Sequence, residues 1–108
     1  MPTVNLFEIG RESGSSDALQ FAPDETTPSL LDGEVFVTGV NTKATAITNF
    51  TDAEAGIVYT IYGNGSENAS TIASGGNFVL TEAITLSEGK FIKLAKAADG
   101  KFYEVARG

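Results

Sequence analysis

The chain of 108 residues contains no cysteine, no histidine and no tryptophan. Without cysteine, disulfides, thiolate zinc sites and thiol nucleophiles are all excluded. Without histidine, the usual general base at neutral pH and the commonest metal ligand are missing as well. The composition therefore favours a protein that binds or assembles over an enzyme, and we expect no catalytic residue, no cofactor and no metal.

Basic residues are also scarce, since seven Lys and Arg stand against 14 Asp and Glu, for a net charge of −7. An acidic domain of this size repels a phosphate backbone, so nucleic acid is not an expected partner. The few basic residues are concentrated in 90–108, whereas 1–34 is strongly acidic. The acidic N-terminal region could lie near a basic C-terminal strand of the same or a neighbouring molecule. Alternatively, the acidic and the basic residues simply lie on surfaces exposed to water.

Long hydrophobic runs are absent. No apolar stretch approaches the roughly 18 residues needed to cross a bilayer. The first residues, Met1–Asn5, lack the basic and apolar regions of a secretory signal. We therefore expect no membrane partner and synthesis in the cytoplasm.

The first third of the chain has no regular hydrophobic period. It holds all three prolines and the run Ser13–Ser16, and its apolar residues occur in isolated pairs. This pattern fits neither a helix nor a sustained strand. It predicts an extended N-terminal arm over residues 1–33, with Leu6, Phe7 and Ile9 as candidate anchors. A disordered tail is the alternative.

Residues 34–108 are rich in β-branched and aromatic residues, broken by glycine and asparagine. Such spacing predicts an all-β domain, either a compact β-sandwich or a β-roll of short strands. The turn at Asp99-Gly100 predicts a hairpin between the last two strands. The expected strands cover 35–40, 45–48, 57–62, 70–73, 78–80, 84–86, 90–96 and 101–106.

The central strands carry apolar groups on both faces, which a half-exposed antiparallel sheet usually does not. In 57–62, three isoleucine and tyrosine side chains alternate with a valine, a threonine and another tyrosine. Either these strands lie at the centre of a sandwich, or their second face contacts another subunit, because a chain this small has little material to cover both faces. The candidate interface residues are Tyr59, Ile61, Phe91 and Ile92.

Two other residue sets are candidates for chemistry. Tyr59, Tyr62 and Tyr103 could contact a glycan, because tyrosine stacks on apolar sugar faces and keeps a hydroxyl for hydrogen bonding. The alternative is that they are half-buried edge or core residues.

Asp52 and Glu54 could form an acid and base pair. No aromatic neighbour raises the pKa of either carboxyl group there, so we interpret them as solvated turn residues.

Several short motifs occur in order between Ala46 and Arg107. They are Ile47-Thr48-Asn49-Phe50, Gly56, Gly63-x-Gly65, Thr71-Ile72, Gly76-Asn77-Phe78-x-Leu80, Leu86, Gly89, Ile92-x-Leu94 and Lys101-Phe102-Tyr103-Glu104-Val105. With these motifs the chain resembles a module of phage and prophage structural proteins, found in tail-fibre and tailspike regions and in small capsid-associated proteins. Members often have tryptophan where this chain has Phe102. The resemblance implies a trimeric β-rich virion component and carries over no catalytic residue.

Together, the arm, the β-domain and the resemblance predict a bacteriophage capsid decoration or head-fibre protein. It would reside in the virion as a homotrimer and bind the major capsid protein through its arm. A receptor- or glycan-binding module of a tail fibre or tailspike is the alternative. A β-domain with no role in a virion is a third.

Overall fold

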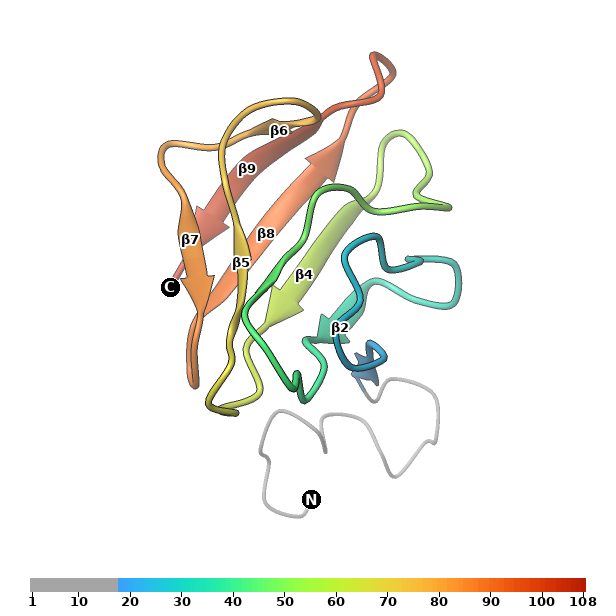
Figure 1. The fold of residues 1–108 in the computed structure, drawn as a ribbon. Coiled ribbons are helices and arrows are strands. Elements are labelled where there is room, and N and C mark those ends of the chain that lie inside the picture. The colour runs from blue at the N-terminus through green and yellow to red at the C-terminus, as the bar shows by residue number, and fades with distance from the viewer. Residues whose placement is uncertain (1–17) are drawn as a thin grey trace, which may run out of the picture.

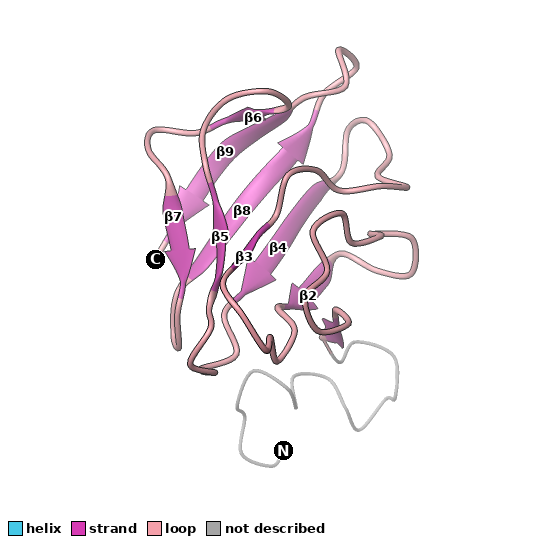
Figure 2. Cartoon of the chain, viewed as in Figure 1, coloured by secondary structure: helices cyan, strands magenta, loops and turns pink. Residues whose placement is uncertain are grey.

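A computed structural model describes residues 18–108, and residues 1–17 lie outside the described part. Strands, turns and loops make up the whole described range, in which there is no helix (Figure 2). The predicted all-β class is therefore confirmed. The strands are β1 (Leu19–Gln20), β2 (Val35–Val37), β3 (Thr45–Ala46), β4 (Val58–Tyr62), β5 (Ser70–Ile72), β6 (Phe78–Val79), β7 (Ile84–Leu86), β8 (Phe91–Lys96) and β9 (Phe102–Arg107).

The strands form two sheets that face each other (Figure 1). The larger sheet has six strands in the order β1-β2-β4-β8-β9-β6, and the smaller has three in the order β3-β5-β7. Pairing is mixed: β1, β2 and β4 run parallel, β4, β8 and β9 alternate in direction, and β6 is parallel to β9. The architecture is a small two-layer sandwich.

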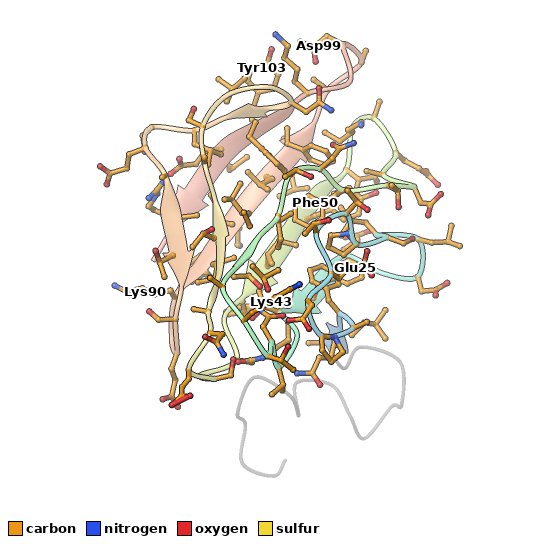
Figure 3. All side chains as sticks on the ribbon, viewed as in Figure 1. Glu25, Lys43, Phe50, Lys90, Asp99 and Tyr103 are labelled. Atoms are coloured by element: carbon orange, nitrogen blue, oxygen red, sulfur yellow. The ribbon has the colours of Figure 1, made fainter. Side chains whose placement is uncertain are left out.

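The core lies between the two layers. The large sheet contributes one face of its central strands, and the small sheet contributes Ile72, Ile84 and Leu86. Phe50 is 2% exposed and its ring centroid lies 5.5–5.9 Å from three other phenylalanine rings (Figure 3). Tilted and edge-to-face arrangements of this kind are favourable for aromatic rings. The buried residues that the large sheet supplies are Phe36, Tyr59, Ile61, Ile92, Leu94, Phe78 and Phe102.

Residues 18–33 belong to this folded unit. Strand β1 pairs with β2, and Phe21 and Leu30 are buried in the core. Leu30 also donates its backbone N–H to the carbonyl of Thr51, 2.9 Å away. The predicted arm boundary at residue 33 therefore lies inside the β-domain. Sequence reasoning missed β1 because a two-residue edge strand is too short to show a period.

The predicted hairpin is confirmed. Strands β8 and β9 pair antiparallel, with a β-bulge between Lys93 and Leu94, and the connection spans residues 97–101. The turn is closed by the Asp99 carboxylate, which accepts a hydrogen bond from the backbone N–H of Lys101 at 2.8 Å. Gly100 has φ of +89°, which suits glycine.

Candidate interaction surface

The outer face of the six-stranded sheet is the side that points away from the core. Side chains alternate between the two faces along a strand. In β4, β8 and β9, the residues next to a buried residue in the sequence therefore point to the outer face. The register places Val58 opposite Ala95, Ala95 opposite Tyr103, and Tyr103 beside Val79. These four residues, here called the outer row, cross four adjacent strands over roughly 14 Å.

The outer row is apolar and open to solvent. Val58 and Val79 are each 41% exposed, and Tyr103 is 37% exposed. Four positions farther along β4 and β8, Tyr62 and Phe91 form a second apolar pair on the same face, with ring centroids 5.4 Å apart. Single exposed apolar residues are ordinary, whereas a contiguous group on a sheet face indicates an interaction surface.

A positive charge lies between these two apolar groups. Lys93 is exposed on β8, opposite Thr60 on one side and Ala106 on the other. Within residues 18–108 it has no carboxylate partner at ion-pair distance. The outer face is therefore apolar with a central unpaired lysine, in contrast to the acidic character of the whole chain.

The β-bulge opposite Lys93 is fixed by a polar network at the end of β9. Arg107 donates from Nε to the Glu104 carboxylate at 2.8 Å and from a terminal nitrogen to the Glu82 carbonyl at 2.6 Å. Glu104 also accepts from the backbone N–H of Thr81 at 2.9 Å. The network ties β9 to the β6–β7 connection, and Val105 beside it is 57% exposed.

We expect Glu104→Gln to lower stability at neutral pH by up to roughly 1.5–3 kcal/mol, because a neutral amide replaces the charged acceptor of the hydrogen bonds from Arg107 and Thr81. Hydrogen bonds from Arg107 and then Thr81 lower the pKa of Glu104 from 4.5 to about 2. A carboxyl whose pKa falls on folding stabilises the protein fully above its unfolded pKa. That contribution is lost as the pH drops from 4.5 through about 2.

Urea unfolding of the wild type and Glu104→Gln at several pH values between neutrality and pH 2 measures this difference. The gap between the two proteins should close as the pH falls through that window. A gap of constant size down to pH 2 would contradict the assigned role of Glu104, because Asp24 and Asp99, whose pKa values are also lowered, are present in both proteins.

Three of the four candidate interface residues lie in the subunit's own core. Tyr59, Ile61 and Ile92 are 3%, 0% and 0% exposed and point toward the small sheet. Only Phe91 is on the outer face. The central strands do carry apolar groups on both faces, as the sequence predicts. The small sheet covers the inner face, so only the outer face, with the outer row, is accessible to another molecule.

The three tyrosines do not form one platform. Tyr59 is buried, and its hydroxyl oxygen accepts a hydrogen bond from the backbone N–H of Glu54 at 2.9 Å. Tyr62 and Tyr103 share the outer face, but they are opposite Phe91 and Ala95, four residues apart on β8 or roughly 13 Å. The Tyr103 hydroxyl donates to Asp99 at the hairpin tip at 2.6 Å, which raises the pKa of Tyr103 (Figure 3).

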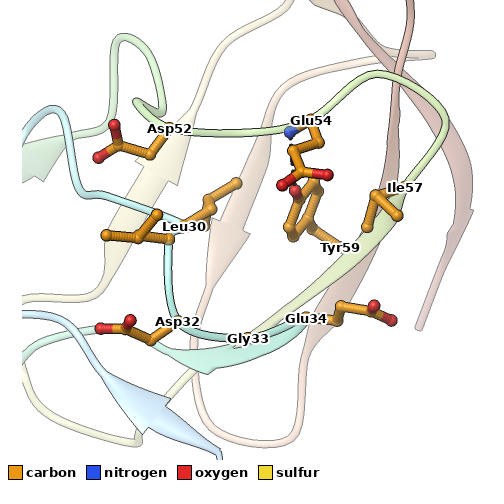
Figure 4. A pocket seen from close by; sticks show the side chains of 9 residues that line it. Leu30, Asp32, Gly33, Glu34, Asp52, Glu54, Ile57 and Tyr59 are labelled. Carbon is orange, nitrogen blue, oxygen red and sulfur yellow. Dashed lines mark hydrogen bonds between the residues drawn. The ribbon is translucent and has the colours of Figure 1, made fainter.

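A second surface feature is an acidic pocket of about 270 Å³ beside β2 and β4. Two loops line it, and each carries two carboxylates: Asp32 and Glu34 on one, Asp52 and Glu54 on the other (Figure 4). The apolar part of its lining includes Leu30, Ile57 and Tyr59. The sequence around Asp52 and Glu54 predicts only solvated turn residues, because the second acidic pair is 18 residues away along the chain.

The remaining candidate residues, Leu6, Phe7 and Ile9, lie outside the described residues. In the range 18–108, no three acidic side chains are arranged to hold a metal ion. That same range has no helix long and apolar enough to span a membrane.

Comparison of the chain with models of protein families, with curated proteins and with solved structures finds no significant match. The resemblance to phage structural modules therefore stays a prediction that rests on the motifs quoted for it.

Proposed function

We propose that this chain is a non-enzymatic structural protein of a virus particle, a bacteriophage capsid decoration or head-fibre protein. The observation that carries the proposal is the outer row, a contiguous apolar surface on a sheet whose other face is already buried. Such a surface suits permanent assembly with other protein. The ordered motifs shared with phage modules support the same conclusion.

The proposed assembly has two contacts. Residues 1–17, which include Leu6, Phe7 and Ile9, attach the protein to the major capsid protein, and the outer face joins subunits into a homotrimer. A closed rotational assembly suits a component that sits on a symmetry axis of a shell.

Attachment can be tested with expanded capsids of the phage that the proposal implies as the source of this chain. We expect a variant that lacks residues 1–16 to lose cosedimentation with the capsids, and Leu6→Ser, Phe7→Ser and Ile9→Ser together to do the same. The deletion should end at residue 16, because Phe21 and Leu30 are in the core and a longer deletion would unfold the domain.

The matched control replaces Ser13, Ser15 and Ser16 by alanine, which leaves the apolar residues of the same segment unchanged. It should bind as well as the wild type. Equal binding of the wild type and the deletion variant would remove the anchoring role of the segment.

The alternative function is a glycan-binding module of a tail fibre or tailspike. It is favoured by the position of Tyr62 and Tyr103 on the outer face, where an aromatic ring can stack on a sugar. A glycan array probed with the full chain distinguishes the two functions. A specific signal that Tyr103→Ala abolishes would replace decoration as the conclusion, and its absence would leave decoration in place.

A further inference from the structure

The outer row and Lys93 are exposed in the described chain, and the charge of Lys93 restricts which surface can cover them. If two identical outer faces met around a two-fold axis, each would bring its Lys93 into the same interface. Like charges placed together in an interface repel each other and strongly disfavour that association. The occupant should therefore be apolar and acidic, and it should differ from the outer face itself.

The chain carries such a surface on its 31–34 loop. Leu31 is 69% exposed, more than any other large hydrophobic residue described. It is followed by Asp32 and Glu34, and with them it lines the acidic pocket (Figure 4). Neither carboxylate makes an ion pair within residues 18–108. The loop thus presents an apolar side chain with two free negative charges.

The pocket and the outer row lie on different sides of the large sheet. Tyr59 lines the pocket from the inner face of β4, whereas Val58 points to the outer face from the neighbouring position. One molecule can therefore offer its loop to a neighbour and its outer face to another. Contacts of this head-to-tail kind form closed rings when the rotation allows it.

We propose that the outer face of one copy binds the 31–34 loop of a second copy, with Leu31 against the outer row and Asp32 and Glu34 around Lys93. This contact rests on the homotrimer part of the proposed function and specifies how its subunits meet. It is independent of how residues 1–17 bind the capsid.

Reversing the charges on the two surfaces tests the contact. Sedimentation equilibrium up to high micromolar protein concentration measures the association constant of each variant. The wild type should associate, and association should weaken as salt is added. Lys93→Glu should weaken it at least about tenfold, and so should the pair Asp32→Lys and Glu34→Lys. The three changes in one chain should restore most of the lost association, because the signs are then complementary again.

Matched controls apply the same charge changes elsewhere. Lys43→Glu and the pair Glu25→Lys and Glu67→Lys should leave association unchanged, since these residues are neither on the outer face nor on the 31–34 loop. Leu31→Ser should weaken association without lowering the midpoint of urea unfolding, because Leu31 is exposed. Circular dichroism confirms that every variant is folded.

The outcomes separate this contact from the proposed function. A wild type that stays monomeric overturns the contact and the trimer, and capsid cosedimentation of the same sample then shows whether decoration stands. A trimer that tolerates both reversals overturns the contact alone. If the wild type is monomeric and Lys93→Glu loses capsid binding, the capsid and not a second copy covers the outer face.

Discussion

Replacing Phe50 by alanine is expected to lower the free energy of unfolding by about 3–5 kcal/mol, the usual range for a large aromatic side chain lost from a core. Phe50 is 2% exposed and lies between the two sheets, in contact with Phe21, Phe78 and Phe102. Its removal leaves a cavity between the three segments that carry Phe21, Phe78 and Phe102, and these segments cannot close the cavity without a shift of the strands. In a domain of this size, the loss is a large fraction of the total stability.

Urea denaturation followed by circular dichroism measures this loss as a lower midpoint with an unchanged slope. Phe91→Ala is the matched control. It removes the same side chain from the half-buried outer face, so the loss should be less than half as large. Equal effects of the two substitutions would show that Phe50 is not the centre of the core.

Gly63→Ala is expected to be nearly as damaging, with a loss of about 3 kcal/mol or more, at or above the upper end of the range for overpacking. A Cβ atom at Gly63 would lie 2.3 Å from the carbonyl oxygen of Leu86 and 2.2 Å from that of Ser87. Both are backbone atoms and cannot rotate away. The chain after β4 would have to separate from the end of β7, which disturbs the contact between the two sheets.

Gly33→Ala provides the control for this substitution. A Cβ atom there would meet only the end of the Leu19 side chain, at 3.3 Å, and a leucine terminus can move by a few tenths of an ångström. Its midpoint of thermal unfolding should stay close to that of the wild type. A small effect of Gly63→Ala in the same experiment would mean that the approach of β7 is looser than the structure indicates.

The need for a glycine at position 63 shows one limit of what can be predicted from the sequence. The Gly63-Asn64-Gly65 stretch predicts a turn that needs positive φ, and Gly65 does have φ of +85°. Gly63 does not have a positive φ. A glycine is needed there because the backbone at the end of β7, 23 residues later in the chain, leaves no room for a Cβ atom. A local pattern indicates a backbone conformation, but it carries no information on which distant segment comes close.

The candidate site was only partly predictable for a related reason. Alternation along residues 57–62 showed correctly that both faces carry apolar groups, but it could not say which set faces the core. Tyr59 and Ile61 were assigned to an interface and are buried, whereas Val58 on the opposite face was not singled out. The acidic pocket joins two loops that are far apart in the sequence and meet through the bridge between Ser29 and Thr51 and the hydrogen bond from the Ser29 hydroxyl to Asp52.

The sequence by itself determined the all-β class, most of the strands and the final hairpin, because these depend on side-chain shape, alternation and turn residues that act over a few positions. Tertiary structure alone decided that residues 19–33 belong to the domain, which face of each strand is buried, and how the outer row is aligned. Parallel pairing of β1, β2 and β4 and the register of four strands bring these groups together. Such long-range pairings arise from the packing of the two sheets as a whole, and no short stretch of the chain encodes them.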